Sequence, residues 1–123
     1  MKTSDLIVNT LLNAGTDKIF SLSGNQIMPV YDAMIDKEID IIHCRHEAAA
    51  VFMADGYAQT SGKIGISLVT AAPGFTNALG PLYAIKANQS PILLLSGDSP
   101  LSQDGLMAFQ ELNQYEIIRE LVK

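Results

Sequence analysis

Three ionisable residues in a row, Arg45, His46 and Glu47, form the stretch of the chain best equipped for chemistry. An apolar run at residues 39–43 precedes them and the small and apolar residues 48–53 follow, so we expect Glu47 to begin a helix directly after a strand. An acid there would complement the helix macrodipole by about 0.3 to 1 kcal/mol. Because its neighbours offer little polar surface, an inward-facing carboxylate could instead share a proton with a ligand nitrogen. Position alone leaves both interpretations open.

The neighbours of Glu47 are less specific. A histidine beside a helix start, such as His46, is either a hydrogen-bonded structural group or a catalyst, and the first is the commoner case. Asp98 is the other acid near a strand end, but its Gly, Ser and Pro neighbours indicate a solvated loop. Glu47 is therefore the first candidate for a reacting group.

Composition predicts one cytoplasmic domain over residues 1–123. A chain of this length rarely divides into two cores, and it contains no apolar run of the roughly 20 residues that a membrane span requires. The polar N-terminus has no signal-peptide pattern. The net charge of -5 and the scattered basic residues argue against nucleic-acid partners. Cys44 is the only cysteine, which excludes an internal disulfide and a Cys-built metal site, and we expect it in the core.

Apolar runs alternate with helical patterns along the chain. The expected strands are residues 19–22, 39–43, 64–69 and 92–96, and the expected helices are residues 4–14, 26–35, 47–61 and 73–87, with a last helix carrying residues 117–122. Ser4 would cap the first helix, and the unbroken apolar run at 92–96 suits a strand covered on both faces. This alternation predicts an α/β fold with a doubly wound, mostly parallel sheet flanked by helices.

Ligands of such sheets bind beyond the carboxyl ends of the strands. The turns expected there are residues 23–25, 45–47, 72–74 and 97–99. Gly24 and Gly74 would let the backbone approach a ligand, and Asn77 could aim its amide at the same place. The turns contain neither the spaced glycines of a dinucleotide site nor the lysine of a P-loop. Gly80-Pro81 predicts a kink in the helix that follows.

The stretch from residue 97 to residue 113 has no clear period. An irregular segment of this length in a compact domain is usually functional or disordered. The chain then stops after a short amphipathic helix, where an alternating pattern would continue with another strand. We therefore expect a fragment of a longer protein.

Four segments resemble the N-terminal pyrimidine-binding domain of thiamine diphosphate-dependent enzymes, with the acetolactate synthase branch closest. They are residues 20–32 (FSLSGNQIMPVYD), 45–58 (RHEAAAVFMADGYA), 72–77 (APGFTN) and 108–112 (AFQEL). The resemblance covers essentially the whole chain in the expected order. It implies the thiamine diphosphate-binding fold and is more specific for the domain than for the substrate.

The resemblance also implies roles for individual residues. In this family a glutamate at the position of Glu47 hydrogen-bonds the ring nitrogen of the aminopyrimidine and favours the tautomer that removes the thiazolium proton. By similarity the other site residues are Gly24 and Asn25 beside the pyrimidine, Pro73, Gly74 and Asn77 in the ring's pocket, and Phe109 and Gln110 on the substrate side. The implied substrate is a 2-keto acid such as pyruvate, which is decarboxylated or carboligated.

Two departures from the family pattern stand out. Ala72 lies where the family typically has the first glycine of Gly-Pro-Gly. In the family a second domain holds the diphosphate through Mg²⁺ with a Gly-Asp-Gly motif, which this chain lacks. Residues 97–99 are similar to the motif but have Ser99 in place of its second glycine. The resemblance therefore implies a cofactor shared with the magnesium-binding domain of a partner subunit, no metal ligands here, and no activity of the chain alone.

The assembly and the function keep alternatives. The small residues at 48–58 permit close helix contact and predict a homodimer or tetramer, and the resemblance leaves room for FAD in a full-length protein. A non-catalytic α/β subunit-assembly module of the same fold is the alternative function. An isolated nucleotide-binding domain is a third, which the missing phosphate fingerprint disfavours.

Overall fold

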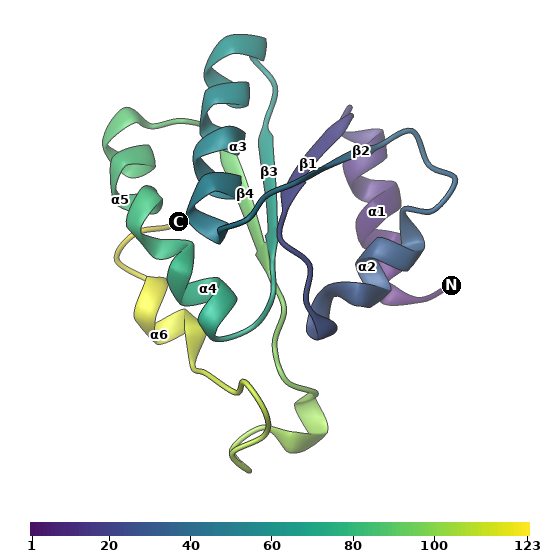
Figure 1. Ribbon diagram of the computed structural model, residues 1–123, viewed down its shortest axis with the longest axis vertical. Coiled ribbons are helices and arrows are strands. Elements are labelled where there is room, and N and C mark those ends of the chain that lie inside the picture. The colour runs from purple at the N-terminus through teal and green to yellow at the C-terminus, as the bar shows by residue number, and fades with distance from the viewer.

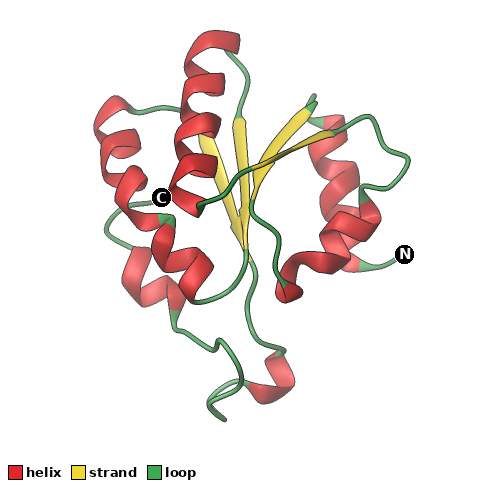
Figure 2. Cartoon of the chain, in the orientation of Figure 1, coloured by secondary structure: helices red, strands yellow, loops and turns green.

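Four parallel strands form one sheet in the order β2-β1-β3-β4. They are β1 (Lys18–Ser21), β2 (Asp40–His43), β3 (Gly65–Val69) and β4 (Ile92–Ser96). The computed structural model describes residues 1–123 and confirms the predicted α/β class with a parallel sheet (Figures 1 and 2). No helix is both long and apolar enough to span a bilayer.

Helices cover both faces of this sheet. They are α1 (Thr3–Asn13), α2 (Met28–Ala33), α3 (Glu47–Ser61), α4 (Pro73–Asn77), α5 (Leu79–Asn88) and α6 (Gln114–Ile118), with short 3₁₀ turns η1 (Asn25–Ile27) and η2 (Leu101–Gln103). Figure 1 shows α1 and α2 on one side of the sheet and α3, α4 and α5 on the other. The crossover through α2 lies on one face and those through α3 and through α4 and α5 lie on the other, so the sheet is doubly wound, as predicted.

The core is divided by the central strand β3, all of whose residues are buried. Ile66 and Leu68 pack with residues of α1 and β1 on one face, and Val69 packs with Val51 of α3 on the other. At Gly65 the strand touches α3 itself, because a Cβ on this glycine would lie 2.0 Å from the carbonyl oxygen of Ala54. The helix that begins with Glu47 is thus held directly against the middle of the sheet.

The expected burial of residues 92–96 on both faces is wrong. β4 lies at the edge of the sheet, and Leu93 is 39% exposed. The strand covered on both faces is β3 instead. An apolar run therefore identified a strand but not its place in the sheet, since place depends on the order of pairing.

Two helix ends also differ from the prediction. α1 begins at Thr3, so Ser4 lies inside the helix and buries its side chain, while the Asp5 carboxylate accepts a hydrogen bond from the Lys2 backbone at 2.7 Å. At the other end of the chain, α6 ends at Ile118, and Leu121 lies beyond it. Near the kink expected at Gly80-Pro81, the helix is interrupted at the single residue Ala78, between α4 and α5. Pro81 has no N–H to donate to the carbonyl of Asn77, one turn earlier.

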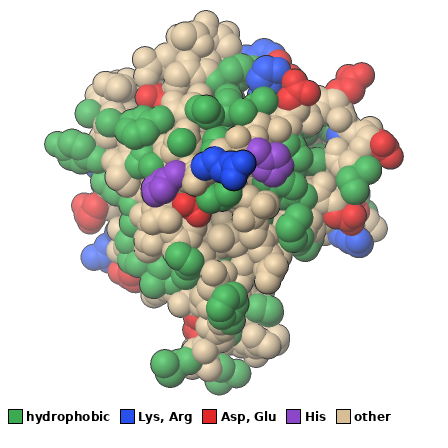
Figure 3. Space-filling view, viewed as in Figure 1, with side chains coloured by type: hydrophobic (Ala, Val, Ile, Leu, Met, Phe, Trp, Pro, Cys, Tyr) green, Lys and Arg blue, Asp and Glu red, His purple; other side chains and the backbone are tan.

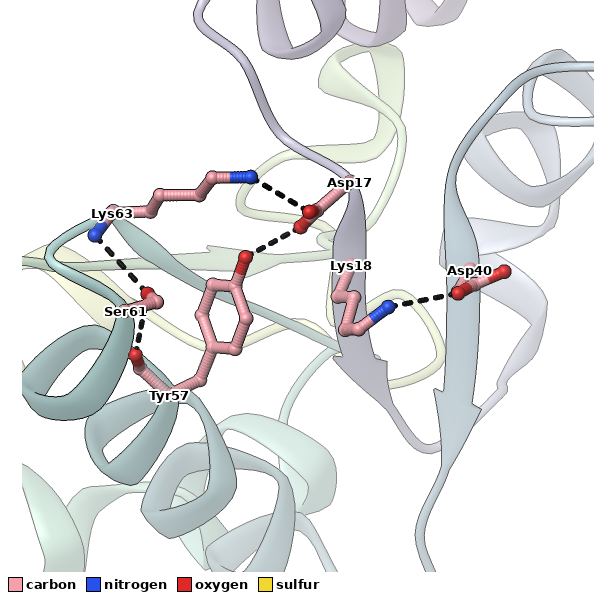
Figure 4. Close-up of polar contacts among 6 residues, drawn as sticks. All are labelled: Asp17, Lys18, Asp40, Tyr57, Ser61 and Lys63. Atoms are coloured by element: carbon pink, nitrogen blue, oxygen red, sulfur yellow. Dashed lines mark hydrogen bonds and ion pairs between the residues drawn. The ribbon is translucent and has the colours of Figure 1, made fainter.

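A polar cluster ties α3 to the amino end of the sheet (Figure 4). Asp17 accepts hydrogen bonds from the Tyr57 hydroxyl at 2.5 Å and from the Lys63 ammonium at 2.7 Å. Lys18 of β1 pairs with Asp40 of β2 at 2.9 Å. The pKa of Asp17 is lowered from its ordinary value of 3.8 to about 2. The hydrogen bond from Lys63 is the largest cause and the hydrogen bond from Tyr57 is the next. A cavity of about 390 Å³ opens beside the cluster.

The depressed pKa of Asp17 predicts an acid limb in the stability of the chain. The folded state holds the carboxylate charged, so its contribution is fully present above pH 3.8 and is lost as the pH falls toward about 2. Urea unfolding of the wild type and of Asp17→Asn at pH 6, 4, 3 and 2 measures it. We expect the gap between the two proteins to close as the pH falls, and a gap that stays constant would contradict the linkage.

Candidate active site at the carboxyl ends of the strands

The connection from β2 to β3 brings Glu47 to the middle of the sheet, at the carboxyl ends of its strands. β2 lies at one side of the sheet and β3 two places away, so α3 must cross over β1, and it packs against both β1 and β3. Glu47, the first residue of α3, therefore arrives beside α4, which follows β3. The Asn77 side-chain amide donates a hydrogen bond to Glu47 Oε2 at 3.0 Å, and Glu47 is only 7% exposed.

The second carboxylate oxygen of Glu47 has no hydrogen-bond partner within the chain. Glu47 Oε1 faces Gly74, where a Cβ would lie 3.4 Å from it. A buried carboxylate with one oxygen fixed and the other free, beside a backbone that carries no side chain, can hold a proton for a ring nitrogen or accept one from it. The structure thus brings together three of the predicted residues, namely Glu47, Gly74 and Asn77.

Thr70, which the sequence did not single out, connects the turns around this site. A Cβ on Gly24 would lie 2.4 Å from Thr70 Cβ, and one on Gly74 would lie 2.7 Å from Thr70 Cγ2. The Thr70 hydroxyl donates to Gln26 Oε1 at 2.8 Å. Thr70 therefore fills the space beside both glycines. Packing is thus a reason for glycine at these two positions, separate from the predicted approach of a ligand. The place of Thr70 directly after β3 was the available signal.

The remaining predicted residues lie farther out. Asn25 is exposed at the start of η1, and Pro73 occupies the first turn of α4 as expected. Phe109 is 75% exposed, and Gln110 has a positive φ of 61°. Both lie in the segment that projects below the sheet in Figure 1, and neither makes a hydrogen bond to Glu47 or Asn77. The structure does not bring this pair together with the acid.

Comparison with known proteins places the chain in a family. Residues 1–117 match the family described as "Thiamine pyrophosphate enzyme, N-terminal TPP binding domain". The chain belongs to this family. Thiamine pyrophosphate is the same compound as thiamine diphosphate, so the resemblance seen in the sequence is confirmed.

The relatives of this TPP-binding domain include several acetolactate synthases. The chain is 38% identical to the acetolactate synthase large subunit of Buchnera aphidicola subsp. Schizaphis graminum and 37% identical to the isozyme 3 large subunit of Escherichia coli, in each case over 98% of this chain and 21% of the relative. It is 35% identical to a probable acetolactate synthase large subunit of Methanocaldococcus jannaschii over 100% of this chain. The TPP-binding domain thus spans about a fifth of these relatives' length.

The site residues of the TPP-binding domain fit a pyrimidine ring. The free Glu47 Oε1 can exchange a hydrogen bond with a ring nitrogen, and Gly74, the residue it faces, adds no side chain of its own there. The chain contains no group of three His, Cys, Asp or Glu side chains that could hold a metal ion.

Cys44 is buried next to Met53, and this burial raises the pKa of its thiol, so it is a core side chain as predicted.

The two histidines of the chain, His43 and His46, lie close to Glu47 in the sequence, and both are exposed. Both histidines of the chain lie on the face shown in Figure 3, on either side of a basic side chain. The His43 ring lies against Tyr31, with ring centroids 5.8 Å apart and the planes tilted by 36°. The imidazole of His46 accepts a hydrogen bond from the backbone N–H of Ala48 at 3.1 Å. Of the two interpretations of His46, the structure supports the hydrogen-bonded structural group.

Ala72, at the first position of the family's Gly-Pro-Gly turn, has a strained backbone. Its φ of 44° and ψ of -95° lie outside the regions open to a residue with a Cβ. The strain follows from the chain's path, because β3 must turn sharply to start α4 with Pro73. A glycine adopts such angles without this cost.

Ala72→Gly is therefore expected to raise the free energy of unfolding. Relief of the strain outweighs the added entropy of the unfolded chain, for a net gain of about 1 kcal/mol measured by urea unfolding. The same change one residue earlier, at Ala71, is the control. Ala71 is fully buried and is not among the positive-φ residues, so Ala71→Gly should lower stability. A loss of stability in Ala72→Gly would contradict the interpretation of strain.

Proposed function

We propose that the chain is the pyrimidine-binding half of a thiamine diphosphate-dependent enzyme that decarboxylates or carboligates 2-keto acids such as pyruvate. The observation that carries the proposal is the buried carboxylate of Glu47, with Oε2 bound to Asn77 and Oε1 free beside Gly74. The names of the acetolactate synthase relatives support the substrate class.

Glu47 has the central role in this proposal. Its Oε1 would hold a proton against the ring nitrogen of the aminopyrimidine, and the bond from Asn77 keeps the carboxylate from rotating away. Little water reaches an acid that is 7% exposed, so its hydrogen bond to a ring nitrogen would have little competition from solvent. When bound, the cofactor supplies an electron sink for the carbon that loses carbon dioxide.

The other predicted residues complete the binding surface. We assign Gly24, Asn25 and Pro73 to the walls around the pyrimidine, because their turns meet the turn of Gly74 through Thr70 or adjoin it. Phe109 and Gln110 would serve the substrate side. Since their segment projects from the sheet, they would act where this domain meets another one.

The rest of the cofactor would be bound outside this chain. The chain gathers no metal-binding cluster, so we place Mg²⁺ and the diphosphate on another domain, contributed by a partner subunit. The 123 residues would then be inactive alone. FAD, if the full-length protein carries it, would likewise be bound outside these residues. We place the enzyme in the cytoplasm.

The outer face of α3 supports a homodimeric or tetrameric assembly. Phe52 and Met53 are 53% and 46% exposed. A helix that is apolar or small on its outer side as well as its inner side is usually buried on both. A second subunit packed on α3 would bury these side chains close to Glu47.

The test uses the protein that carries this domain together with its magnesium-binding part. Release of carbon dioxide from pyruvate is measured with thiamine diphosphate and Mg²⁺, with each omitted in turn, and with the 123-residue chain alone. We expect turnover that requires both additions and none from the chain alone. An intact assembly that binds no thiamine diphosphate and turns over no 2-keto acid would support the assembly module instead.

A further inference from the structure

His46 is the N-cap of the helix that begins with Glu47. Its backbone is extended, with φ of -156° and ψ of 140°, and its ring Nδ1 accepts a hydrogen bond from the Ala48 N–H at 3.1 Å. We propose that His46 is a positioning residue, whose cap fixes the first turn of α3 and thereby holds the Glu47 carboxylate toward the pyrimidine. The inference rests on the function proposed above for Glu47.

The cap matters because of what the carboxylate would do without it. The first N–H groups of a helix have no partner within the helix, and an acid in the first turn is well placed to accept from them. In this chain the His46 ring binds the N–H of Ala48, and the His46 carbonyl oxygen accepts from the N–H of Ala49, at 3.1 Å in each case. The Glu47 side chain is thereby left free to face Asn77.

The ring of His46 is suited to this role and to no other visible one. It is exposed, and its bond to Ala48 is its only side-chain hydrogen bond. An imidazole nitrogen that accepts a hydrogen bond carries a lone pair, so the neutral ring has its proton on Nε2. Asn, whose side-chain oxygen is among the best caps, can replace this acceptor, and Ala cannot.

The experiment compares three variants in the protein that carries this domain and its magnesium-binding part. His46→Ala should lower kcat about 10- to 100-fold with KM for the 2-keto acid changed less than about threefold, because a misplaced acid slows the reaction more than it weakens binding. His46→Asn should restore kcat to within about threefold of the wild type.

Asn113→Ala is the matched control. Asn113 is the N-cap of α6 and accepts from the backbone N–H of Glu116 at 3.2 Å, and it makes no hydrogen bond to Glu47. Loss of this cap should leave kcat unchanged. A general loss of stability would lower kcat in both cap variants, whereas loss of positioning lowers it only at His46.

A second readout does not depend on activity. Amide hydrogen exchange at Ala48 should be about tenfold faster in His46→Ala, and unchanged in His46→Asn and Glu47→Gln. Wild-type kcat in His46→Ala, or a His46→Asn protein that protects Ala48 yet is as slow as His46→Ala, would overturn the inference. Failure of the proposed function is a separate result, namely full turnover by Glu47→Gln.

Discussion

Glu47→Gln is expected to lower turnover of a 2-keto acid by about 10²- to 10⁴-fold while leaving the fold intact. Glutamine has nearly the same shape, and its amide oxygen can still accept the bond that Asn77 donates to Oε2 at 3.0 Å. What is lost is the ability to hold a proton against a ring nitrogen at the position of Oε1. Steady-state kinetics on the full protein, with circular dichroism as the check on folding, measures the effect.

Asp98→Asn is the matched control for this substitution. Asp98 is the acid after β4, it is exposed, and it accepts a hydrogen bond from the Ser99 N–H at 2.8 Å. The same chemical change there should alter turnover less than about twofold, since an exposed surface charge has a small effect. Near wild-type turnover by Glu47→Gln would remove the basis of the proposed function.

Gly65→Ala is expected to lower the free energy of unfolding by about 3 kcal/mol or more, because the added methyl has no room in a closely packed core. The new Cβ would lie 2.0 Å from the Ala54 carbonyl oxygen and 2.7 Å from its carbon, both backbone atoms of α3. A backbone cannot swing aside as a side chain can, so α3 would have to move off β3. Urea unfolding of the chain measures the change.

The control for this variant is a glycine on α3 itself. Gly56 is exposed in the middle of the helix, and a Cβ there would meet no atom within 4 Å. Gly56→Ala should therefore raise stability by about 0.5 to 1 kcal/mol through helix propensity. If Gly65→Ala proved as stable as the wild type, the direct contact between α3 and β3 would be wrong.

Much of the fold was predictable because its signals are local. Apolar runs and helical spacing located all four strands of the sheet and the start of α3 at Glu47, and Gly62 ends that helix with a positive φ of 72°. Propensity failed at the ends of elements, where several residues compete for one role. Ser4 had the chemistry of a cap, but the helix begins before it.

The sequence by itself determined the order of elements, the parallel sheet, the family and the acid at the head of α3. Only the tertiary structure decided what that acid meets. Asn77 lies 30 residues from Glu47, and Thr70 lies 44 residues from Gln26, so the local spacing of residues predicts neither contact. Both contacts arise because α3 crosses β1 to reach β3. This connection brings three turns together at the carboxyl ends of the strands. A local pattern specifies an element, whereas the meeting of two turns depends on strand order and on packing at Gly65 and Thr70.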